Sequence, residues 1–294
     1  MTLFDKGAEL GGMVESVIPP EKQSGSLKNE IAAVFADVPK DRMILRLAKE
    51  LNADFNLDTI SQEGFDAVFI GMGLPKSVSI SDRDTDIDGV WDAMAFLSAA
   101  KEPGPGTRTL DVAGKCVAAI GGGNTAMDVA LTAKRLGAKD VYVIYRRSFK
   151  EMPAWSAERD RAINEGVHFL ILTQPLGFNS HDGKLTTITV CPTRLGEPDA
   201  SGRRRPEPVE SSAYELDMDI VVEAIGQKAP EEISEILPGV ELTKGLIRTK
   251  EGTLATSRPG VFAGGDLVRG PSTVVAAVAD GMAAAKQINE FLKR

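Results

Sequence analysis

Near the middle of the chain, six residues have the types and the spacing that suit binding of a nucleotide pyrophosphate. They are Gly121-Gly122-Gly123-Asn124-Thr125-Ala126, which follow a short apolar run and precede a helical pattern. In such a loop Gly121 allows a tight turn, Gly123 lets the backbone approach the phosphates, and Ala126 keeps the helix close to the strand. The helix N-terminus offers free N–H groups and a positive dipole end. The pattern predicts a dinucleotide-binding unit, although a glycine signature alone also fits an ordinary strand-to-helix turn.

Two cations stand where the ribose of the nucleotide would be recognised. A second apolar run, Val141 to Tyr145, ends directly on Arg146 and Arg147. Units that bind NAD usually carry an acid at this place to hold the ribose 2′-hydroxyl, whereas guanidinium groups suit a 2′-phosphate. We therefore expect NADP(H) rather than NAD(H). The alternative interpretation is that the two arginines form a solvated strand end.

The elements that position these residues follow from hydrophobic periodicity. Apolar runs at 117–120, 141–145 and 219–226 predict buried strands. The stretch PKDRMILRLAKEL, residues 39–51, places four apolar side chains on one helical face and predicts a helix.

A different pattern covers the region between the second and third of these strands. From Lys184 to Asp219 the chain alternates between apolar and polar residues, with a polar turn at 199–202. This alternation predicts an antiparallel hairpin layer. Arg203, Arg204 and Arg205 lie just past the turn, and a solvated hairpin tip suits them better than a binding patch.

Composition limits the possible functions. A chain of 294 residues is long enough for two domains with proper cores. The net charge of −8 makes nucleic acid an unexpected partner. We find no apolar run long enough to cross a bilayer and no secretory signal at the start, so we expect a cytoplasmic protein without a membrane span.

The few cysteines and histidines exclude several kinds of site. The two cysteines, Cys116 and Cys191, are far apart, and the sequence contains no C-x-x-C. This argues against a redox dithiol, against thioredoxin-reductase-like disulfide reduction, and against iron–sulfur ligands within this chain. With only two histidines as well, we expect no metal site. No Tyr-x-x-x-Lys pair occurs, which disfavours a single-domain alcohol-type dehydrogenase.

Several blocks, taken together, resemble one family. The resemblance is to the NADPH-dependent glutamate synthase small subunit (beta chain), whose flavin module is shared with dihydropyrimidine dehydrogenase and related electron-bifurcating transhydrogenases. The blocks occur in the family's order over nearly the whole chain, and they are specific as a set. They are the strand ending at Asp5 with Gly11-Gly12, FDAVFIGMG, GGGNTAMD, YRRS followed by EMPA, DIVVEAIGQ and GVFAGGDLVRGPSTVVAAVADG.

The resemblance implies an α/β fold with two Rossmann-like dinucleotide-binding domains of the glutathione-reductase type. The NADP(H) domain, residues 109–228, would be inserted in an FAD domain formed by residues 1–108 and 229–294. The family's first strand and glycine loop come before the strand that ends at Asp5. We therefore expect the FAD domain to be incomplete and FAD to be bound weakly or not at all.

The activity implied by the resemblance is that of a flavoprotein oxidoreductase. Hydride would pass from NADPH to FAD, and electrons would leave for an iron–sulfur domain or subunit, with a glutamate synthase large subunit as one candidate partner. Because the cofactors carry this chemistry, no catalytic acid or base is expected from the chain. The alternative is a fragment or non-catalytic NADP(H)-binding module that does not retain FAD.

The resemblance also assigns cofactor-binding residues. Asp5 would accept hydrogen bonds from the ribose of the FAD adenosine, and Asp266 would hold the ribityl chain. A helix beginning near residues 271–274 would point its amides at the pyrimidine edge of the flavin. The full set expected to contact a cofactor is Gly121, Gly122, Gly123, Asn124, Thr125, Ala126, Arg146, Arg147, Ala224, Ile225, Gly226, Asp5, Gly12, Gly73, Gly265, Asp266, Ser272 and Thr273.

Overall fold

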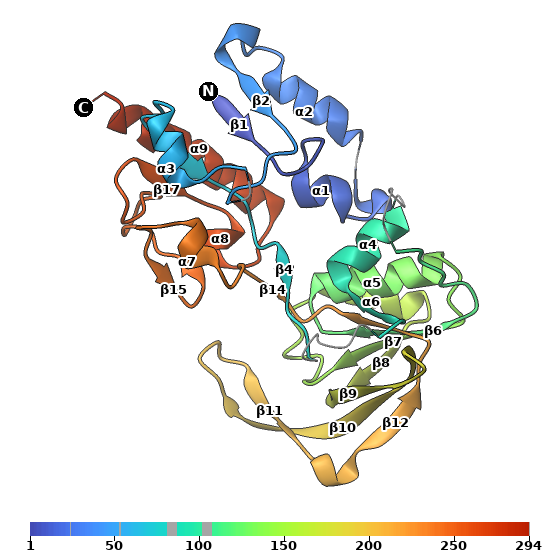
Figure 1. The fold of residues 1–294 in the computed structure, drawn as a ribbon. Coiled ribbons are helices and arrows are strands. Elements are labelled where there is room, and N and C mark those ends of the chain that lie inside the picture. Colours follow the sequence, from blue (N-terminus) through green and yellow to red (C-terminus); the bar gives the residue numbers. More distant parts are fainter. Residues whose placement is uncertain (24, 53, 81–86, 102–107, 294) are drawn as a thin grey trace. The chain divides into compact units, whose positions relative to one another are not determined.

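The computed structural model describes residues 1–294 except 24, 53, 81–86, 102–107 and 294 (Figure 1). The chain forms two compact units. The first unit contains Met1–Gly12, Lys28–Lys76 and Gly226–Arg294, and the second contains Met13–Leu27 and Ser77–Ile225. The described part of 77–108, which the sequence analysis assigned to the FAD domain, packs with the second unit, because β5 (Val90–Asp92) pairs with β13 (Ile220–Glu223).

The second unit is built on a five-stranded parallel sheet. Its order is β5-β13-β6-β7-β8, where β6 is Cys116–Ile120, β7 is Asp140–Tyr145 and β8 is His168–Ile171. The strands predicted at 117–120, 141–145 and 219–226 are thus confirmed. Their continuous apolar runs are typical of parallel strands that are covered on both faces.

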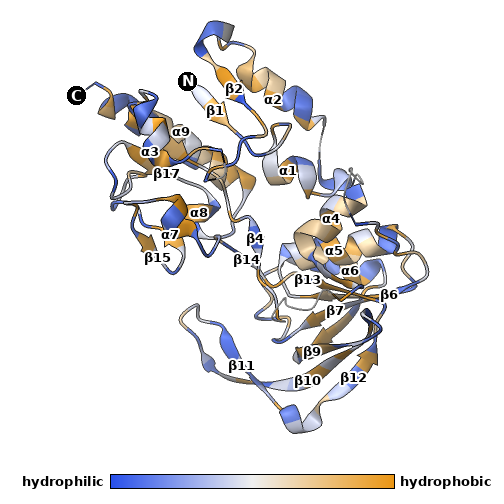
Figure 2. Ribbon diagram, viewed as in Figure 1, coloured by the Kyte–Doolittle hydropathy of each residue, from blue (hydrophilic) through white to orange (hydrophobic). Residues whose placement is uncertain are grey.

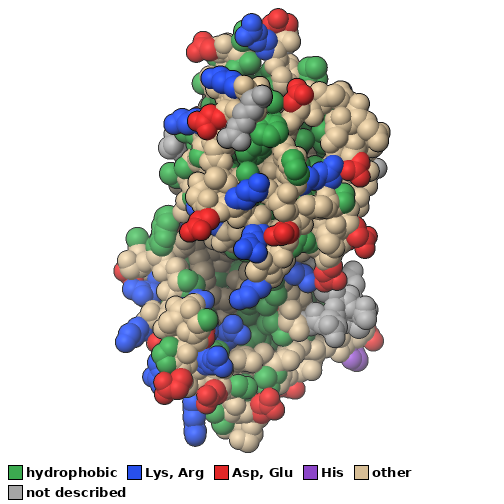
Figure 3. All heavy atoms as spheres, turned by 90° about the vertical axis from the view of Figure 1, so that its left-hand side faces the viewer, with side chains coloured by type: hydrophobic (Ala, Val, Ile, Leu, Met, Phe, Trp, Pro, Cys, Tyr) green, Lys and Arg blue, Asp and Glu red, His purple; other side chains and the backbone are tan. Residues whose placement is uncertain are grey.

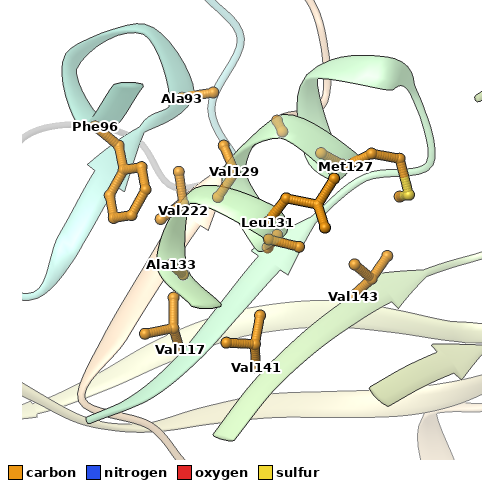
Figure 4. Packing of buried hydrophobic residues seen from close by; sticks show 14 of the residues in the cluster. Ala93, Phe96, Val117, Met127, Val129, Leu131, Ala133, Val141, Val143 and Val222 are labelled. Atoms are coloured by element: carbon orange, nitrogen blue, oxygen red, sulfur yellow. The ribbon is translucent and has the colours of Figure 1, made fainter. Parts of the chain in front are cut away.

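Helices cover one face of this sheet. They are α4 (Ala93–Lys101), α5 (Asn124–Arg135) and α6 (Ser156–Asn164). In Figure 4, Met127 and Leu131 of α5 lie over β7, the strand that carries Val141 and Val143. Burial of each such aliphatic side chain contributes roughly 1.5–3 kcal/mol, so this layer holds α5, and the loop before it, against the sheet.

The other face is covered by the antiparallel layer that the alternation predicted. It contains β9 (Thr173–His181), β10 (Lys184–Pro198), β11 (Arg204–Pro208) and β12 (Tyr214–Asp217), with a 3-10 turn η3 (Glu210–Ser212). Ile188 and Val190 of β10 join Ile144 of β7 in one buried cluster. Figure 2 shows that β11, at the far side of this layer, is largely hydrophilic.

A short segment near the N-terminus also belongs to the second unit. It contains most of α1 (Gly12–Ser16) and the 3-10 turn η1 (Pro20–Lys22). Lys22 Nζ lies 2.6 Å from Asp128 Oδ1 of α5 and 2.8 Å from Glu158 Oε2 of α6. Burial lowers the pKa of Lys22, but the hydrogen bonds and charges of the two carboxylates outweigh it, so the net pKa is raised.

The first unit contains smaller sheets and several helices. Two parallel pairs are β1 (Thr2–Phe4) with β2 (Ile44–Arg46) and β3 (Val68–Ile70) with β17 (Val261–Ala263). The short strands are β14 (Gln227–Lys228), β15 (Leu242–Thr243), β16 (Leu246–Ile247) and β4 (Lys76–Ser77), the last of which spans the boundary between the two units. The helices are α2 (Leu27–Phe35), η2 (Lys40–Arg42), α3 (Leu57–Gln62), α7 (Ile233–Ile236), α8 (Asp266–Arg269) and α9 (Val274–Phe291).

The helix predicted over 39–51 is wrong. Residues 40–42 form the single turn η2, and Ile44–Arg46 form β2, which pairs with β1. Ala48 has a φ of 51°, which is incompatible with a continuing right-handed helix. The apolar spacing was helical by chance, and pairing with β1 determined the local structure.

Among the described residues, we find no helix that is both long enough and apolar enough to span a bilayer.

Candidate functional site

The glycine loop lies between β6 and α5, at the carboxyl edge of the parallel sheet. Gly121 has a φ of 138°, and a Cβ added there would collide with the carbonyl oxygen of Ala224 at the end of β13. At Gly122 a Cβ would lie 2.5 Å from a ring carbon of Tyr145. At Gly123 a Cβ would meet nothing within 4 Å. The first two glycines are therefore required by the fold, whereas the third leaves open space beside the backbone.

Helix α5 presents its N-terminus at this open space. It begins at Asn124, with Gly123 as the N-cap and no side-chain cap. The first N–H groups of a helix have no intrahelical partner and carry a partial positive charge, so an uncapped start can receive an anion. Ala126 is completely buried against the sheet, which allows the helix to start close to the strand.

Residues 151–155, which follow Arg147, hold the glycine loop in place through hydrogen bonds. The N–H of Ala154 donates to Gly122 O at 2.9 Å, and the N–H of Trp155 donates to Asn124 Oδ1 at 3.0 Å. The Tyr145 hydroxyl donates to Glu151 O at 2.9 Å. The Glu-Met-Pro-Ala stretch contributed to the family resemblance, but the sequence analysis gave it no role. Its position directly after the two arginines was the available signal.

Glu151 fixes this segment to the end of β7. Ser148 Oγ donates to Glu151 Oε2 at 2.5 Å. This hydrogen bond holds the pKa of the Glu151 carboxyl below its usual value, although burial acts in the opposite direction. The ionised form of Glu151 is therefore the one that the fold stabilises.

The two arginines at the end of β7 are in different environments. The residue Arg147 is only 6% exposed. Its Nη2 donates to Asp199 Oδ2 at 2.8 Å, and its Nε donates to Arg204 O at 2.7 Å. Arg146 has an exposed side chain, while its carbonyl accepts a hydrogen bond from Thr193 Oγ1 at 2.8 Å. Partial desolvation, followed by the charge of Arg147, lowers the pKa of Arg146.

Of the three residues expected after β13, Ala224 lies next to the glycine loop. The N–H of Ala224 donates to Ile120 O at 2.8 Å, so β13 and β6 end together. Ile225 is partly exposed, and Gly226 has a φ of 129°. The fold thus brings Ala224 together with the predicted loop at the carboxyl edge of the sheet, where ligands of doubly wound sheets bind.

In the first unit, four of the predicted residues gather at the start of α9. Gly265 has a φ of 71° and precedes Asp266, whose Oδ1 accepts from the N–H of Ser272 at 3.1 Å. Burial raises the pKa of Asp266. Thr273 is the N-cap of α9, and its Oγ1 accepts from the N–H of Ala276 at 3.2 Å.

Asp280, a buried acid on α9, was missed by the sequence analysis. Its Oδ2 accepts from the N–H of Gly265 at 2.7 Å and from Arg269 Nε at 3.1 Å. Asp280 lies within the helical run GPSTVVAAVADG, where one acid has no distinguishing pattern. Its role is to hold the turn that contains Gly265 against the helix.

Of the other predicted residues of the first unit, Asp5 and Gly73 lie at loop positions, and Gly12 is the first residue of α1. Asp5 follows β1, and its Oδ1 accepts from the N–H of Gly7 at 2.7 Å. Gly12 and Gly73 have φ values of 52° and 67°, and a Cβ at either would meet nothing within 4 Å. Both glycines are therefore chosen by backbone conformation and not by crowding.

Comparison with known proteins agrees with this architecture. Residues 12–281 match the family described as pyridine nucleotide-disulphide oxidoreductase. The chain is 39% identical to the NADP(+)-dependent formate dehydrogenase subunit beta of Moorella thermoacetica, covering 100% of this chain and 41% of the relative. It is 36% identical to the glutamate synthase [NADPH] small chain of Escherichia coli K12, covering 99% of this chain and 63% of the relative. The chain thus spans about half the length of these two relatives.

Solved structures share the fold. Mycobacterium tuberculosis FprA in complex with NADPH superposes with a TM-score of 0.77 at 16% identity, covering 99% of this chain and 77% of that one. Thioredoxin reductase of T. acidophilum superposes with a TM-score of 0.68 at 19% identity, covering 99% and 90%. The expected fold class and the resemblance to the glutamate synthase small chain are confirmed. The chain belongs to the pyridine nucleotide-disulphide oxidoreductase family.

Proposed function

We propose that this chain is the NADPH-to-flavin part of an oxidoreductase. In this proposal the second unit binds NADP(H) and the first binds FAD. The observation that supports it most directly is a contrast within one loop. Neighbouring atoms occupy the space where a Cβ of Gly121 or Gly122 would lie, whereas the space beside Gly123 is open and adjoins the uncapped start of α5. That is the shape and charge a pyrophosphate needs. Gly121 to Ala126, together with Ala224, Ile225 and Gly226, would line this site.

The end of β7 supports the choice of NADP(H) over NAD(H). Arg146 is exposed, and Arg147 lies beside it with its guanidinium engaged in hydrogen bonds. Guanidinium groups bind a phosphate with paired hydrogen bonds, which a ribose hydroxyl cannot match. Figure 3 shows Lys and Arg side chains, with Asp and Glu side chains among them, on the face of the molecule that forms the left-hand side of Figure 1.

The residues at the start of α9 fit one end of a flavin. This helix has 18 residues, and the N–H groups of its first turn can receive partial negative charge. Gly265, Asp266, Ser272 and Thr273 would lie along the ribityl chain and the pyrimidine edge. Asp5, Gly12 and Gly73 would serve the adenosine and pyrophosphate end. Bound flavin would supply the capacity to accept hydride and release electrons one at a time.

We also propose the direction in which electrons leave. The relatives named above are described as a subunit beta and as a small chain. By analogy, the electrons would go to an iron–sulfur domain or subunit, with a glutamate synthase large subunit as one candidate. The compartment would be the cytoplasm. Alternatively, the chain is an NADP(H)-binding module that does not retain FAD.

Three measurements on the purified chain separate these possibilities. Visible absorption after addition of FAD and desalting reports flavin retention. Calorimetric titration with NADPH reports the second unit, and NADPH-dependent reduction of ferricyanide reports the complete path. Retained flavin with ferricyanide reduction would support the oxidoreductase. NADPH binding without flavin would favour the alternative, and absence of NADPH binding would contradict both.

A further inference from the structure

The Arg147 guanidinium already donates hydrogen bonds to other residues of the protein. It is buried, with one nitrogen bonded to the Asp199 carboxylate and another to the Arg204 carbonyl. Both partners belong to the turn and strand of the β10–β11 hairpin. A phosphate that took over these donors would leave the Asp199 charge without its partner, which costs free energy. Arg147 is therefore suited to hold the hairpin in place.

Asp199 connects Arg147 to the next cation along the chain. While its Oδ2 accepts from Arg147, its Oδ1 accepts from the Ser201 N–H at 2.8 Å and from the Arg203 N–H at 3.3 Å. The N–H of Asp199 in turn donates to Arg203 O at 2.8 Å. The backbone on both sides of Arg203 is thus fixed by Asp199, and Asp199 is fixed by Arg147.

The Arg203 side chain keeps donors available. Its Nε donates to Ser201 Oγ at 3.0 Å, and its backbone lies in the turn. In the described part of the chain, neither Arg203 nor Arg146 has a carboxylate within ion-pair distance. Arg204 differs, because its guanidinium donates to the carbonyls of Leu195 and Gly196.

The hydrogen bonds also place Arg203 at the end of β7. Arg146 directly precedes Arg147 in the chain, and the acid bonded to the Arg147 guanidinium holds both the N–H and the carbonyl of Arg203. The Asp199 and Arg147 charges cancel each other. The remaining cations, Arg146 and Arg203, provide two positive charges, which matches the charge of about −2 on a phosphate monoester.

We propose that Arg146 and Arg203 hold the 2′-phosphate of NADP(H), and that Arg147 and Asp199 are positioning residues that place Arg203. This inference rests on the proposed NADP(H) site and names the second cation of its specificity pocket. It assigns a ligand role to a hairpin residue that the sequence analysis expected to be solvated. The hairpin would thereby make NADP(H) selection depend on the antiparallel layer as well as on β7.

The test compares the dissociation constants for NADPH and NADH in matched variants. Arg203→Ala should weaken NADPH binding on the order of 10- to 100-fold, the value of one to two charge-assisted hydrogen bonds, and leave NADH binding unchanged. Arg205→Ala removes the same charge from an exposed position of the same hairpin and should change neither constant by more than about twofold. Arg203→Lys should restore part of the NADPH preference.

A double-mutant cycle tests the positioning role. Asp199→Ala should reduce the preference for NADPH over NADH, and the same change made in the Arg203→Ala background should have little further effect. A purely structural role for Asp199 would lower the affinities for both nucleotides equally. Thermal unfolding of each variant checks that the fold is intact.

The outcomes separate this inference from the proposed function. A wild-type chain that fails to bind NADPH would refute the proposed function itself. Tight and selective NADPH binding that survives Arg203→Ala would refute only the inference. Loss of selectivity in Arg205→Ala equal to that in Arg203→Ala would also overturn it, because then only the net charge of the hairpin would matter.

Discussion

The two units contain the same local motif, a parallel strand followed by glycines and a helix, in very different surroundings. In the second unit, β6 lies between β13 and β7, and its last four residues are buried. In the first unit, β17 is also buried, but it has only three residues and pairs with the three-residue strand β3. The other parallel pair of this unit, β1 with β2, leaves Ile44 54% and Leu45 42% exposed. The parallel strands of the first unit are therefore short, and those of the β1–β2 pair are less covered.

This difference shows which features a strand–glycine–helix motif provides by itself. In both units the glycine adopts a positive φ, as Gly121 and Gly265 do, and a helix begins within a few residues. In the second unit, neighbouring residues then fix Gly121 and Gly122, while Gly123 stays open. In the first, the buried acid Asp280 performs much of this task through a hydrogen bond to the Gly265 N–H. The motif sets the local backbone, and the neighbours determine how rigid the site becomes.

The largest effect is expected from a side chain at Gly121, in the tightly packed part of the second unit's loop. A valine there would collide with Ala224 O and would need an unfavourable φ of 138°. Overpacking and backbone strain together should lower the free energy of unfolding by about 3–5 kcal/mol. Urea denaturation measures this loss. A change of less than about 1 kcal/mol would mean that the loop is not tightly packed.

Gly123→Val is the matched variant with the opposite expectation. A Cβ at this position meets open space, and φ is −91°, so the unfolding free energy should fall by only about 1 kcal/mol, because valine is a poorer N-cap than glycine. The added side chain would occupy the space needed by the pyrophosphate. NADPH affinity should fall by at least about 100-fold, equivalent to roughly 2.7 kcal/mol. Unchanged affinity in a calorimetric titration would contradict the assignment of the loop.

How much of this could be predicted from sequence differs between the two units. The β6 loop and the strands around it are encoded by contiguous patterns, so the sequence identified them. The short strand β2 was not identified, because its apolar residues happened to fall at helical spacing and its structure depends on pairing with distant β1. The separate environments of Arg146 and Arg147 also depend on a distant segment, since Asp199 is 52 residues away from Arg147.

A pair of truncations, one at a buried residue and one at an exposed residue, tests the difference in packing. Leu131→Ala removes a buried side chain from the layer between α5 and the sheet, and should cost about 2–5 kcal/mol. Val278→Ala removes a side chain from the exposed side of α9, where Val278 is 57% exposed. Its cost should stay within about 0.5 kcal/mol. Equal losses of unfolding free energy in chemical denaturation would mean that the exposed side of α9 is buried by another surface in solution.

The ion pairs of the two units provide a smaller test. Lys22→Met would leave the buried carboxylates of Asp128 and Glu158 without their cation, at a cost of about 2 kcal/mol after allowance for partial exposure. Lys28→Met removes an exposed partner of Glu9 and should cost less than about 0.5 kcal/mol.

The pH dependence of the Lys22→Met variant carries a definite sign. Burial raises the pKa of Asp128 above its ordinary value of 3.8, and loss of Lys22 would raise it further. A carboxyl whose folded pKa is raised destabilises the fold above that pKa. The difference in unfolding free energy between the wild type and the variant should therefore shrink as the pH falls through the folded pKa of Asp128. Denaturation curves at neutral and mildly acidic pH measure it, and a constant difference would assign the effect to packing instead.

A further effect of about 1 kcal/mol is expected at the hydrogen-bonded segment beside the glycine loop. Ser148→Ala removes the donor that lowers the pKa of Glu151, and should cost about 1 kcal/mol at neutral pH. Because the folded pKa of Glu151 is lowered from 4.5, its contribution is present above that value and is lost as the pH falls through the folded pKa. The wild type and the variant should thus differ in melting temperature at pH 7 and converge under acid. A difference that persists in acid would show that the Ser148 hydroxyl acts through a contact other than the ionised Glu151 carboxylate.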